Sequence, residues 1–324
     1  MTSTKKGWLP QVCLAWALAC APAVTWAELK LGLSRNPSSG LAHLAQAQGF
    51  FAAEGLKDLV IVPCTSGGEC VERMLKGDFQ ITMASDTSVV VATQEGGLLD
   101  VVATTASSRT SNRIVARKGA DLQTPEQLRG KRVGYLPGTS SHYFTEAFLN
   151  FHGIDVRDVR MVELDPKRAV DQMANGEVDA AGLFHPQAPQ ALQRMGDAGQ
   201  VFPTPPIYTV TVNLLSLPAV SDADLERMLR ALIRAEQYLK AQPEKAHGDL
   251  VRQLGLAAPM VDGMLREFEF RVGLNQSLLV TLESQARWSR RSTLVENRVD
   301  VDYFQRMRPG PLRRIDARRV TLIK

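Results

Sequence analysis

Hydrophobic residues in the first two thirds of the chain form short runs, and amphipathic stretches separate these runs. A short apolar run between turn residues predicts a buried strand, whereas apolar residues at helical spacing predict a helix. Up to residue 108 the predicted strands are 30–33, 59–63, 81–84 and 100–105, and the predicted helices are 41–53, 69–75 and 88–94. This alternation predicts an α/β fold with a parallel sheet covered by helices on both faces.

The same alternation restarts after Arg113. Thr124 and Gln127 form a capping box with Pro125 at the first helical position, which predicts a helix start. The predicted strands that follow are 132–135, 159–164 and 180–184, and the predicted helices are 141–152 and 167–174. The restart predicts a second sheet with its own helices.

After a proline-rich break at 203–206 and a strand at 208–214, the pattern becomes mostly helical. The predicted helices are 221–241, 244–254, 260–268 and 277–291. Connections near residues 104–113 and 202–212 would each cross between the sheets. We therefore predict two lobes joined by two crossings that can hinge over a ligand. The first lobe would comprise 28–108 and 208–324, and the second 109–207.

Residues 1–27 have the pattern of a signal peptide. Lys5 and Lys6 precede an apolar run of about 13 residues, and Thr25-Trp26-Ala27 offers small residues at the cleavage positions. The run is shorter than the roughly 20 residues that span a bilayer. An alternative is lipidation at Cys20, but Ala17 stands where a lipoprotein signal usually has Leu. We expect cleavage before Glu28 and a periplasmic protein.

The charge of the chain gives no reason to expect nucleic-acid binding. Because residues 1–27 contain two lysines and no acid, the formal net charge falls from +4 to +2 on cleavage. Arginines gather near the C-terminal end, where Asp316 and prolines interrupt them. We interpret them as a solvated basic surface, with docking to an acidic partner as the alternative. These arginines are Arg306, Arg308, Arg313, Arg314, Arg318 and Arg319.

Cys64 and Cys70 are the two cysteines that follow the signal peptide. In an oxidising compartment they are candidates for a disulfide, which would add roughly 2–3 kcal/mol to stability. Two buried thiols are the alternative. No histidine stands at the spacing of a zinc site, so we expect no metal.

Four turns share one composition of small polar residues, and each follows a predicted strand and opens a predicted helix. In an open α/β sheet such turns gather outside the carboxyl ends of the strands, where ligands bind. Free N–H groups at helix N-termini suit an anion, although each polar side chain could simply cap its own helix. None of the turns fits a phosphate loop. The turns are 36–39, 65–68, 85–87 and 138–141.

The order of motifs resembles the substrate-binding proteins of nitrate/sulfonate/bicarbonate-type ABC transporters, a group that includes taurine binders and thiamine-precursor binders. The similarity covers most of the chain after residue 27, and the ordered set is more specific than any single motif. The segments that carry it are LAQAQGFFAAEGL at 44–56, SGG at 66–68, GDFQI at 77–81, LRGKRVG at 128–134, GTSSH at 138–142, ANGEVDA at 174–180 and the helix at 276–288.

The resemblance implies a periplasmic binding fold of the second type, without a cofactor, that delivers a small solute to a membrane permease. We expect a monomer. The family's ligand contacts correspond to Ser66, Gly67, Ser85, Asp86, Thr139, Ser140 and Ser141, and the loop with Asn36, Ser38 and Ser39 corresponds to another wall of the cleft.

One departure from the family pattern concerns the residues after the strand at 180–184. Many relatives have Trp-Glu-Pro there, whereas this chain has Phe184-His185-Pro186. Without that acid the site loses an acceptor, which favours an anionic ligand over an amine-bearing one and weakens a taurine-like assignment.

Histidines and arginines supply further candidates. His142 and His185 could line the cleft by their motif positions, with ordinary packing as the alternative. Arg35 and Arg109 could clamp an oxyanion, with surface placement as the alternative. All four are therefore candidate ligand-binding residues.

These patterns predict an exported solute-binding component of an ABC importer, not an enzyme, with a sulfonate, nitrate or carboxylate as ligand. A fold-related enzyme, such as a pyrimidine-precursor synthase or a desulfinase, would need a reactive cysteine at the cleft or a cysteine-rich motif, and the sequence shows neither. A sensor that presents its ligand to a receptor is the other alternative.

Overall fold

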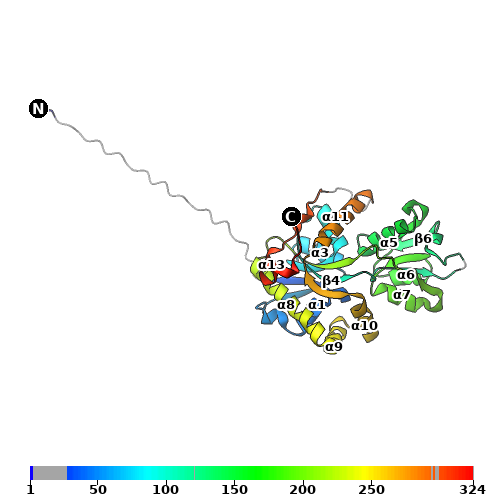
Figure 1. The fold of residues 1–324 in the computed structure, drawn as a ribbon, viewed down its shortest axis with the longest axis horizontal. Helices are drawn as coiled ribbons and strands as arrows, with labels where there is room; N and C mark the ends of the chain where they lie inside the picture. Colours follow the sequence, from blue (N-terminus) through cyan, green and yellow to red (C-terminus); the bar gives the residue numbers. More distant parts are fainter. Residues whose placement is uncertain (3–27, 120, 293–294, 296–298, 324) are drawn as a thin grey trace.

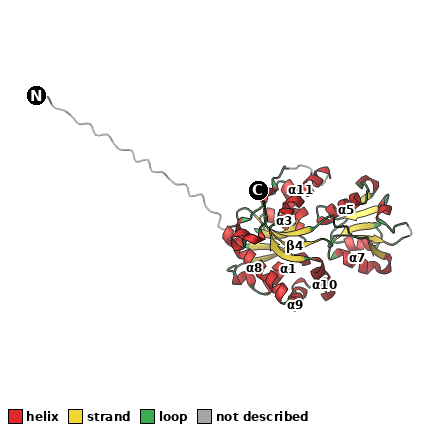
Figure 2. Cartoon of the chain, viewed as in Figure 1, coloured by secondary structure: helices red, strands yellow, loops and turns green. Residues whose placement is uncertain are grey.

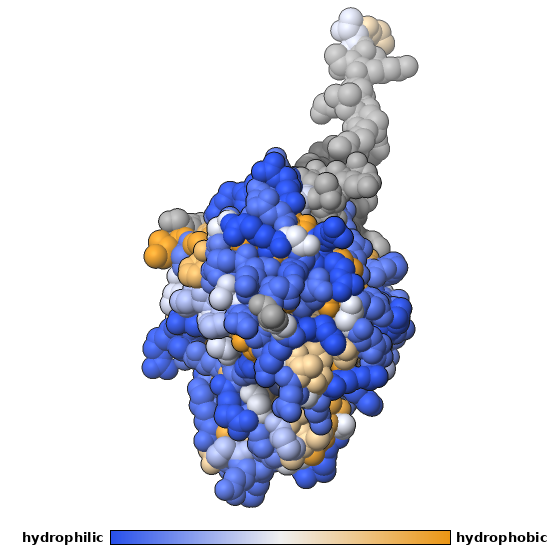
Figure 3. All heavy atoms as spheres, turned by 90° about the vertical axis from the view of Figure 1, so that its right-hand side faces the viewer, coloured by the Kyte–Doolittle hydropathy of each residue, from blue (hydrophilic) through white to orange (hydrophobic). Residues whose placement is uncertain are grey.

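The computed structural model describes residues 1–2, 28–119, 121–292, 295 and 299–323, so most of the expected signal peptide lies outside the described residues. It is a mixed α/β structure with two sheets flanked by helices, which confirms the predicted fold class (Figures 1 and 2). Among the described helices, none is both long enough and apolar enough to cross a membrane. The face in Figure 3 is mostly hydrophilic.

The first sheet has six strands in the order β11-β4-β10-β3-β1-β2. β1 pairs in parallel with β2 and β3, but β10 is antiparallel to β3 and β4, and β11 is antiparallel to β4. The four strands predicted before residue 108 thus share one direction, whereas β10 and β11, from the part of the chain after residue 207, run in the opposite direction. The strands are β1 (Lys30–Ser34), β2 (Val60–Cys64), β3 (Ile81–Ser85), β4 (Asp100–Ser108), β10 (Val210–Ser216) and β11 (Glu269–Gly273).

We call this sheet with its helices the first lobe. Its core is one cluster of buried side chains that includes Leu31, Ile81, Leu214 and Leu232. The helices are η1 (Pro37–Ser39), α1 (Gly40–Ala47), α2 (Phe50–Ala53), α3 (Gly67–Leu75), α4 (Asp86–Gln94), α8 (Asp222–Ala241), α9 (Pro243–Leu254), α10 (Ala258–Glu267), α11 (Gln276–Arg291), α12 (Tyr303–Arg306), α13 (Gly310–Ile315) and η5 (Ala317–Arg319).

The predicted helix at 41–53 is two helices, α1 and α2. Gly49 separates them with a φ of 66°, in the left-handed region that glycine adopts without steric cost. The prediction missed this break because the apolar pattern continues on both sides of Gly49.

The second sheet has five strands in the order β7-β6-β8-β5-β9, and we call it with its helices the second lobe. Ile114 and Val115 of β5 enter two different clusters of buried side chains, because neighbouring strand residues point to opposite faces. The elements are β5 (Arg113–Arg117), η2 (Pro125–Leu128), β6 (Arg132–Tyr135), α5 (Ser140–Phe151), η3 (Val156–Asp158), β7 (Arg160–Glu163), α6 (Ala169–Ala174), β8 (Ala180–Leu183), α7 (Gln187–Met195), η4 (Gly196–Ala198) and β9 (Gly199–Val201).

The chain passes from the first sheet to the second between β4 and β5, and it returns between β9 and β10. The second passage places β10 between β3 and β4. Two covalent connections therefore join the lobes (Figure 1). The boundaries 108/109 and 207/208 stay predictions within these connections.

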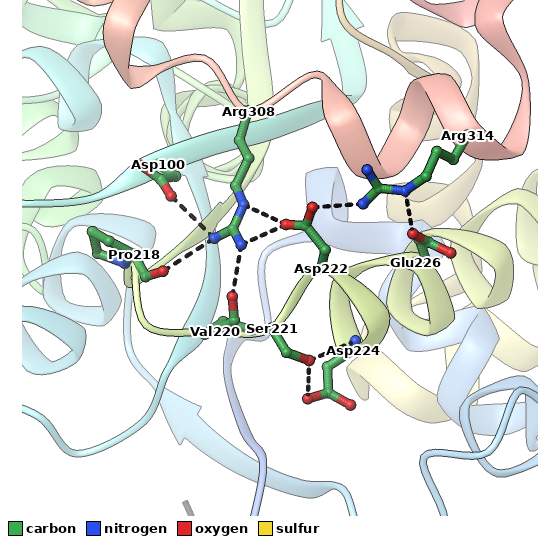
Figure 4. Close-up of polar contacts among 9 residues, drawn as sticks. All are labelled: Asp100, Pro218, Val220, Ser221, Asp222, Asp224, Glu226, Arg308 and Arg314. Carbon is green, nitrogen blue, oxygen red and sulfur yellow. Dashed lines mark hydrogen bonds and ion pairs between the residues drawn. The ribbon is translucent and has the colours of Figure 1, made fainter. Parts of the chain in front are cut away.

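The expected solvated basic surface holds only in part, because Arg313 and Arg318 are exposed, whereas Arg308, Arg314 and Arg319 pair with carboxylates of the first lobe. Arg308 donates to Asp222 at 2.9 Å and to Asp100 at 3.2 Å, and it also binds the carbonyl of Val220 at 2.8 Å. Arg314 donates to Asp222 and Glu226 at 2.6 Å each (Figure 4). Folding brings the carboxylates of α8 and β4 to these arginines, so the cluster fastens the C-terminal segment to the first lobe.

Candidate functional site

The four polar turns lie at helix N-termini that follow strands of both sheets: η1, α3 and α4 in the first lobe and α5 in the second. In each turn a side chain caps the helix. The caps are Asn36 to the Ser38 amide at 3.0 Å, Ser66 to the Glu69 amide at 3.2 Å, Ser85 to the Ser88 amide at 3.3 Å, and Thr139 to the Ser141 amide at 3.2 Å. At Ser66 capping and anion binding are compatible, because the hydroxyl accepts with its oxygen and keeps an O–H to donate. The Thr139 hydroxyl donates to the Leu136 carbonyl at 2.8 Å, and the Ser85 hydroxyl lies 3.0 Å from that of Ser88.

The turn before η1 combines exposed and buried polar groups. Arg35 is exposed and Asn36 is half-buried, whereas Ser38 and Ser39 are buried. The side-chain Oδ1 of Asn36 also accepts from the Ser38 hydroxyl at 2.8 Å. This turn is therefore held by its own side chains, with Arg35 at its outer end.

The turn before α3 is exposed and braced at both ends. Cys64 and Cys70 form a disulfide with their Cα atoms 5.6 Å apart, which encloses residues 65–69. Inside it, the Glu69 carboxylate accepts from the Thr65 amide at 2.8 Å and from the Thr65 hydroxyl, and these bonds lower the pKa of Glu69. A Cβ on Gly67 would lie 3.2 Å from the Ala84 Cα, so α3 packs closely against β3. Ser66 is exposed at this rigid turn.

Asp86, in the turn before α4, is fully buried and bound to protein groups. It accepts from the Thr211 amide at 3.1 Å, from the Thr87 amide at 2.8 Å and from the Tyr208 hydroxyl. Burial raises the pKa of the carboxyl, and these hydrogen bonds oppose the rise. The structure thus gives Asp86 a tethering role between α4 and the second connection, whereas Ser85 beside it is half-buried.

The turn before α5 contains two buried serines with different partners. Ser141 donates to the Gly182 carbonyl at 2.6 Å and accepts from the Leu136 amide at 3.3 Å, so its hydroxyl serves the fold. Ser140 donates to the Asn112 side chain at 3.2 Å. Asn112 is buried at the start of β5, and the sequence analysis missed it because its polar neighbours resembled an ordinary turn.

His142, in the first turn of α5, lies in an aromatic cluster. It stacks on Tyr135 with ring centroids 4.2 Å apart, and it meets Trp288 of α11 edge-on at 5.0 Å. Its Nε2 lies 3.1 Å from the Glu146 carboxylate, and its Nδ1 is buried with no hydrogen-bond partner in the described part of the chain. Trp288 belongs to the first lobe, and its contact with α5 could not be found from sequence spacing.

His185, which precedes Pro186 through a cis peptide bond, lies at another contact between the lobes. Its Nε2 is 3.4 Å from the position of a Cβ on Gly263 of α10. Beside it, Arg113 of β5 forms an ion pair with Glu267 of α10. Burial, together with the nearby Arg113 charge, lowers the pKa of His185 to about 4. The ring is therefore neutral at pH 7.

We call the contact region between the lobes the seam, and its members are Asp86, Arg113, His142, His185, Gly263, Glu267 and Trp288.

Arg109 is exposed on the turn between β4 and β5, next to the first connection. Two cavities lie on the first lobe outside the seam. One, of about 650 Å³, lies beside Phe50 and Arg252, and the other, of about 220 Å³, lies beside Gln94 and Tyr303. Among the residues the structure describes, no cluster of histidine, cysteine or acidic side chains could hold a metal ion.

The architecture defines a class of protein, a two-lobe α/β protein whose lobes meet at a seam and which has capped polar helix N-termini in both lobes. The chain belongs to the NMT1/THI5-like family, because the family model of that description matches residues 36–246.

The chain is also similar to two relatives over part of its length. Over 155 residues the chain is 28% identical to the taurine-binding periplasmic protein of Escherichia coli (strain K12), a stretch that covers 48% of each chain. Over 142 residues it is 24% identical to a protein of Brucella abortus (strain 2308), covering 42% of this chain and 44% of that one. The matched stretches thus span less than half the length of these relatives.

A similar solved structure is the alkanesulfonate-binding protein SsuA from Xanthomonas axonopodis pv. citri bound to MOPS. It superposes with a TM-score of 0.73 at 18% identity, over 89% of this chain and 100% of that chain. This similarity confirms the fold implied by the sequence resemblance.

Proposed function

We propose that this protein is the solute-binding component of an ABC importer, that it works as a monomer in the periplasm, and that it binds a small sulfonate-like anion at the seam. Its partner would be a membrane permease. The observation that carries the proposal is the presence of capped helix N-termini in both lobes, at α3 and α4 on one side and α5 on the other. Such N-termini present N–H groups and partial positive charge to an anion.

The names of the relatives support the sulfonate class, since a taurine binder and an alkanesulfonate binder both take sulfonates. A sulfonate carries three acceptor oxygens and no donor, which suits backbone amides and the Ser66 hydroxyl. His185 stands where many relatives have an acid. Its ring, neutral at pH 7, lacks the negative charge of that acid, which would repel the anion.

We also propose that binding occurs without turnover. Cys64 and Cys70 are bonded to each other, so neither provides a nucleophilic thiol at the seam. A sensor would share this site but would dock on a receptor. Growth on the transported sulfonate should therefore require the cognate permease if the protein serves import, and should be independent of it if the protein is a sensor.

A melting-temperature screen of the protein from Glu28 onward tests the ligand class. The panel contains ethanesulfonate, MOPS, nitrate, bicarbonate, aromatic acids and pyrimidines. We expect a sulfonate to raise the melting temperature, because a ligand at 100 times its dissociation constant adds about 2.7 kcal/mol of stability. If only uncharged pyrimidines stabilise the protein, or if the bound compound is chemically converted, the proposal is wrong.

A variant locates the site. Ser66→Trp should abolish the melting shift and leave the fold intact, because Ser66 is exposed and a large ring there blocks the N-terminus of α3. Leu98→Trp is the matched control, since Leu98 is exposed in the turn before β4, at the opposite end of the strands from Ser66. Equal ligand affinity in Ser66→Trp and the unmodified protein would place the ligand elsewhere.

A further inference from the structure

A hydrogen bond joins the two lobes away from their covalent connections. Trp288 of α11 donates its indole N–H to the Glu146 carboxylate of α5 at 2.8 Å. The other oxygen of the same carboxylate lies 3.1 Å from His142 Nε2. One carboxylate thus holds two rings, one from each lobe.

The two helices are built into different lobes. α11 packs against α4, and its Leu278, Leu282 and Ala286 belong to the core of the first lobe. α5 packs against the second sheet, and its Phe144 and Phe148 belong to the core of that lobe. The Trp288–Glu146 bond therefore joins two separately packed bodies.

Aromatic contacts bury the indole side of this bond, whereas the Glu146 side chain is 18% exposed. The Trp288 ring meets His142 edge-on at 5.0 Å and Tyr143 edge-on at 5.2 Å, and only 5% of Trp288 is exposed. A hydrogen bond to a charged carboxylate is strongest where water is excluded. Opening the seam would expose the Trp288 indole and let water hydrogen-bond to the Glu146 carboxylate.

Two other contacts across the seam lie close to the connections along the chain, whereas the contact of His185 with Gly263 is remote from both. Asp86 binds Tyr208 and Thr211, which flank the start of β10, and Arg113 begins β5. A hinge at the connections moves such neighbours little. Glu146 and Trp288 are remote from both connections in sequence, as are the facing helices α4 and α5, so a hinge movement at the connections acts on their hydrogen bond.

We propose that Glu146 and Trp288 form a latch that holds the lobes closed and thereby sets the affinity for the ligand. This inference rests on the proposed function, since it assumes that the lobes close over a solute. Glu146 and Trp288 are positioning residues: they act on the ligand through the fraction of protein that is closed. Apparent affinity falls in proportion to that fraction.

His142 couples the latch to the ligand site. It follows Ser140 and Ser141 in the first turn of α5, where the proposed anion binds, and its Nε2 contacts Glu146. Its Nδ1 is buried and has no partner within the described residues, so one ring nitrogen serves the latch and the other is left for a ligand group that reaches this position. By linkage, a ligand that favours the closed form strengthens the latch by the same factor.

The chain provides its own optical reporter. Trp8, Trp16 and Trp26 lie within the expected signal peptide, so Trp288 is the single tryptophan of the protein that begins at Glu28. We expect emission at the short wavelength of a buried indole, and we expect Glu146→Gln to shift it to longer wavelength. This measurement needs no ligand. Emission typical of an exposed indole in the unmodified protein would overturn the latch.

With MOPS as the probe, we expect Glu146→Gln and Trp288→Phe to raise the dissociation rate about tenfold, and to change the association rate little. Stopped-flow fluorescence serves for Glu146→Gln, and surface plasmon resonance for Trp288→Phe. Glu163→Gln is the control, because Glu163 loses the same charge but accepts a hydrogen bond at 3.1 Å from Tyr135 within the second lobe.

The outcomes separate the two proposals. If the unmodified protein binds MOPS and both variants release it at the unmodified rate, the latch is wrong and the proposed function stands. If both variants only lower the melting temperature, the contact is structural and the latch is also wrong. If the protein binds none of the anions in the screen, the proposed function fails, and the emission of Trp288 still decides whether the contact exists.

Discussion

At the scale of single residues, the capping roles follow from sequence, but the partners of the remaining polar groups do not. Ser66, Ser85 and Thr139 cap the helices that their positions predict. Asp86 has the same kind of position, yet its carboxylate is taken up by Tyr208 and by Thr211, more than a hundred residues later. Local sequence determines which residue caps a helix, whereas contacts with distant parts of the chain determine which polar groups remain available to a ligand.

His185 gives a prediction on pH dependence. Its pKa is about 4 in the folded protein and about 6.5 in the unfolded chain, because burial and Arg113 penalise the imidazolium. Between these values the unfolded chain binds a proton that the folded protein does not, so stability falls as pH drops from 6.5 towards 4. We expect a loss of about 2 kcal/mol, a figure discounted for solvent that screens the seam.

Urea unfolding at pH 7.0, 5.5 and 4.5 measures this loss. His185→Gln cannot titrate, so its stability should depend less steeply on pH. His247→Gln is the control, since His247 lies on α9 and is not one of the seam residues; it contacts the Ala258 carbonyl at 3.3 Å and the Asp262 carboxylate at 3.0 Å. If the free energy of unfolding depends equally steeply on pH in His185→Gln and in the unmodified protein, the assignment of this pH dependence to His185 is wrong.

At the scale of elements, periodicity finds most strands, including the edge strands β2 and β7, and it misses β5, β9 and β11. β1, β3 and β4 are nearly continuous apolar runs, and their predicted positions agree with the structure within a few residues. β11 was missed because charged Glu269 and Arg271 alternate with its buried residues, and predicted helices lie on both sides of it. A strand at the edge of a sheet needs only one apolar face.

The β2–α3 turn supplies the prediction at this scale. Replacing both Cys64 and Cys70 with Ser should lower the free energy of unfolding by about 2 kcal/mol, because the closed loop is short. It should also weaken MOPS binding, since the turn with Ser66 and Gly67 loses one of its braces. Guanidinium unfolding and calorimetric titration measure the two effects.

The unmodified protein treated with a reducing agent is the matched control, and it should behave like the double variant. Unchanged stability in both samples would show that the disulfide contributes nothing to this turn. If stability falls but the affinity for MOPS does not, the disulfide stabilises the turn without contributing to ligand binding.

At the scale of the whole molecule, the restarting alternation predicted two sheets and two connections, and both are present. The sequence did not predict the return of β10 between β3 and β4, because strand order is decided by pairing between distant segments. The same limit applies to the contact of Trp288 with α5 and to the ion pairs of Arg308 with Asp100 and Asp222. Each of these joins segments that only the complete fold brings together.

The central claim is that an anion binds between the lobes and is held by helix N-termini from both. A crystal structure of the protein grown with MOPS tests it most directly. We predict that the sulfonate oxygens lie within hydrogen-bonding distance of the backbone amides at the start of α3 and of α5. A sulfonate bound outside the seam, such as in the cavity beside Phe50 and Arg252, would contradict the account.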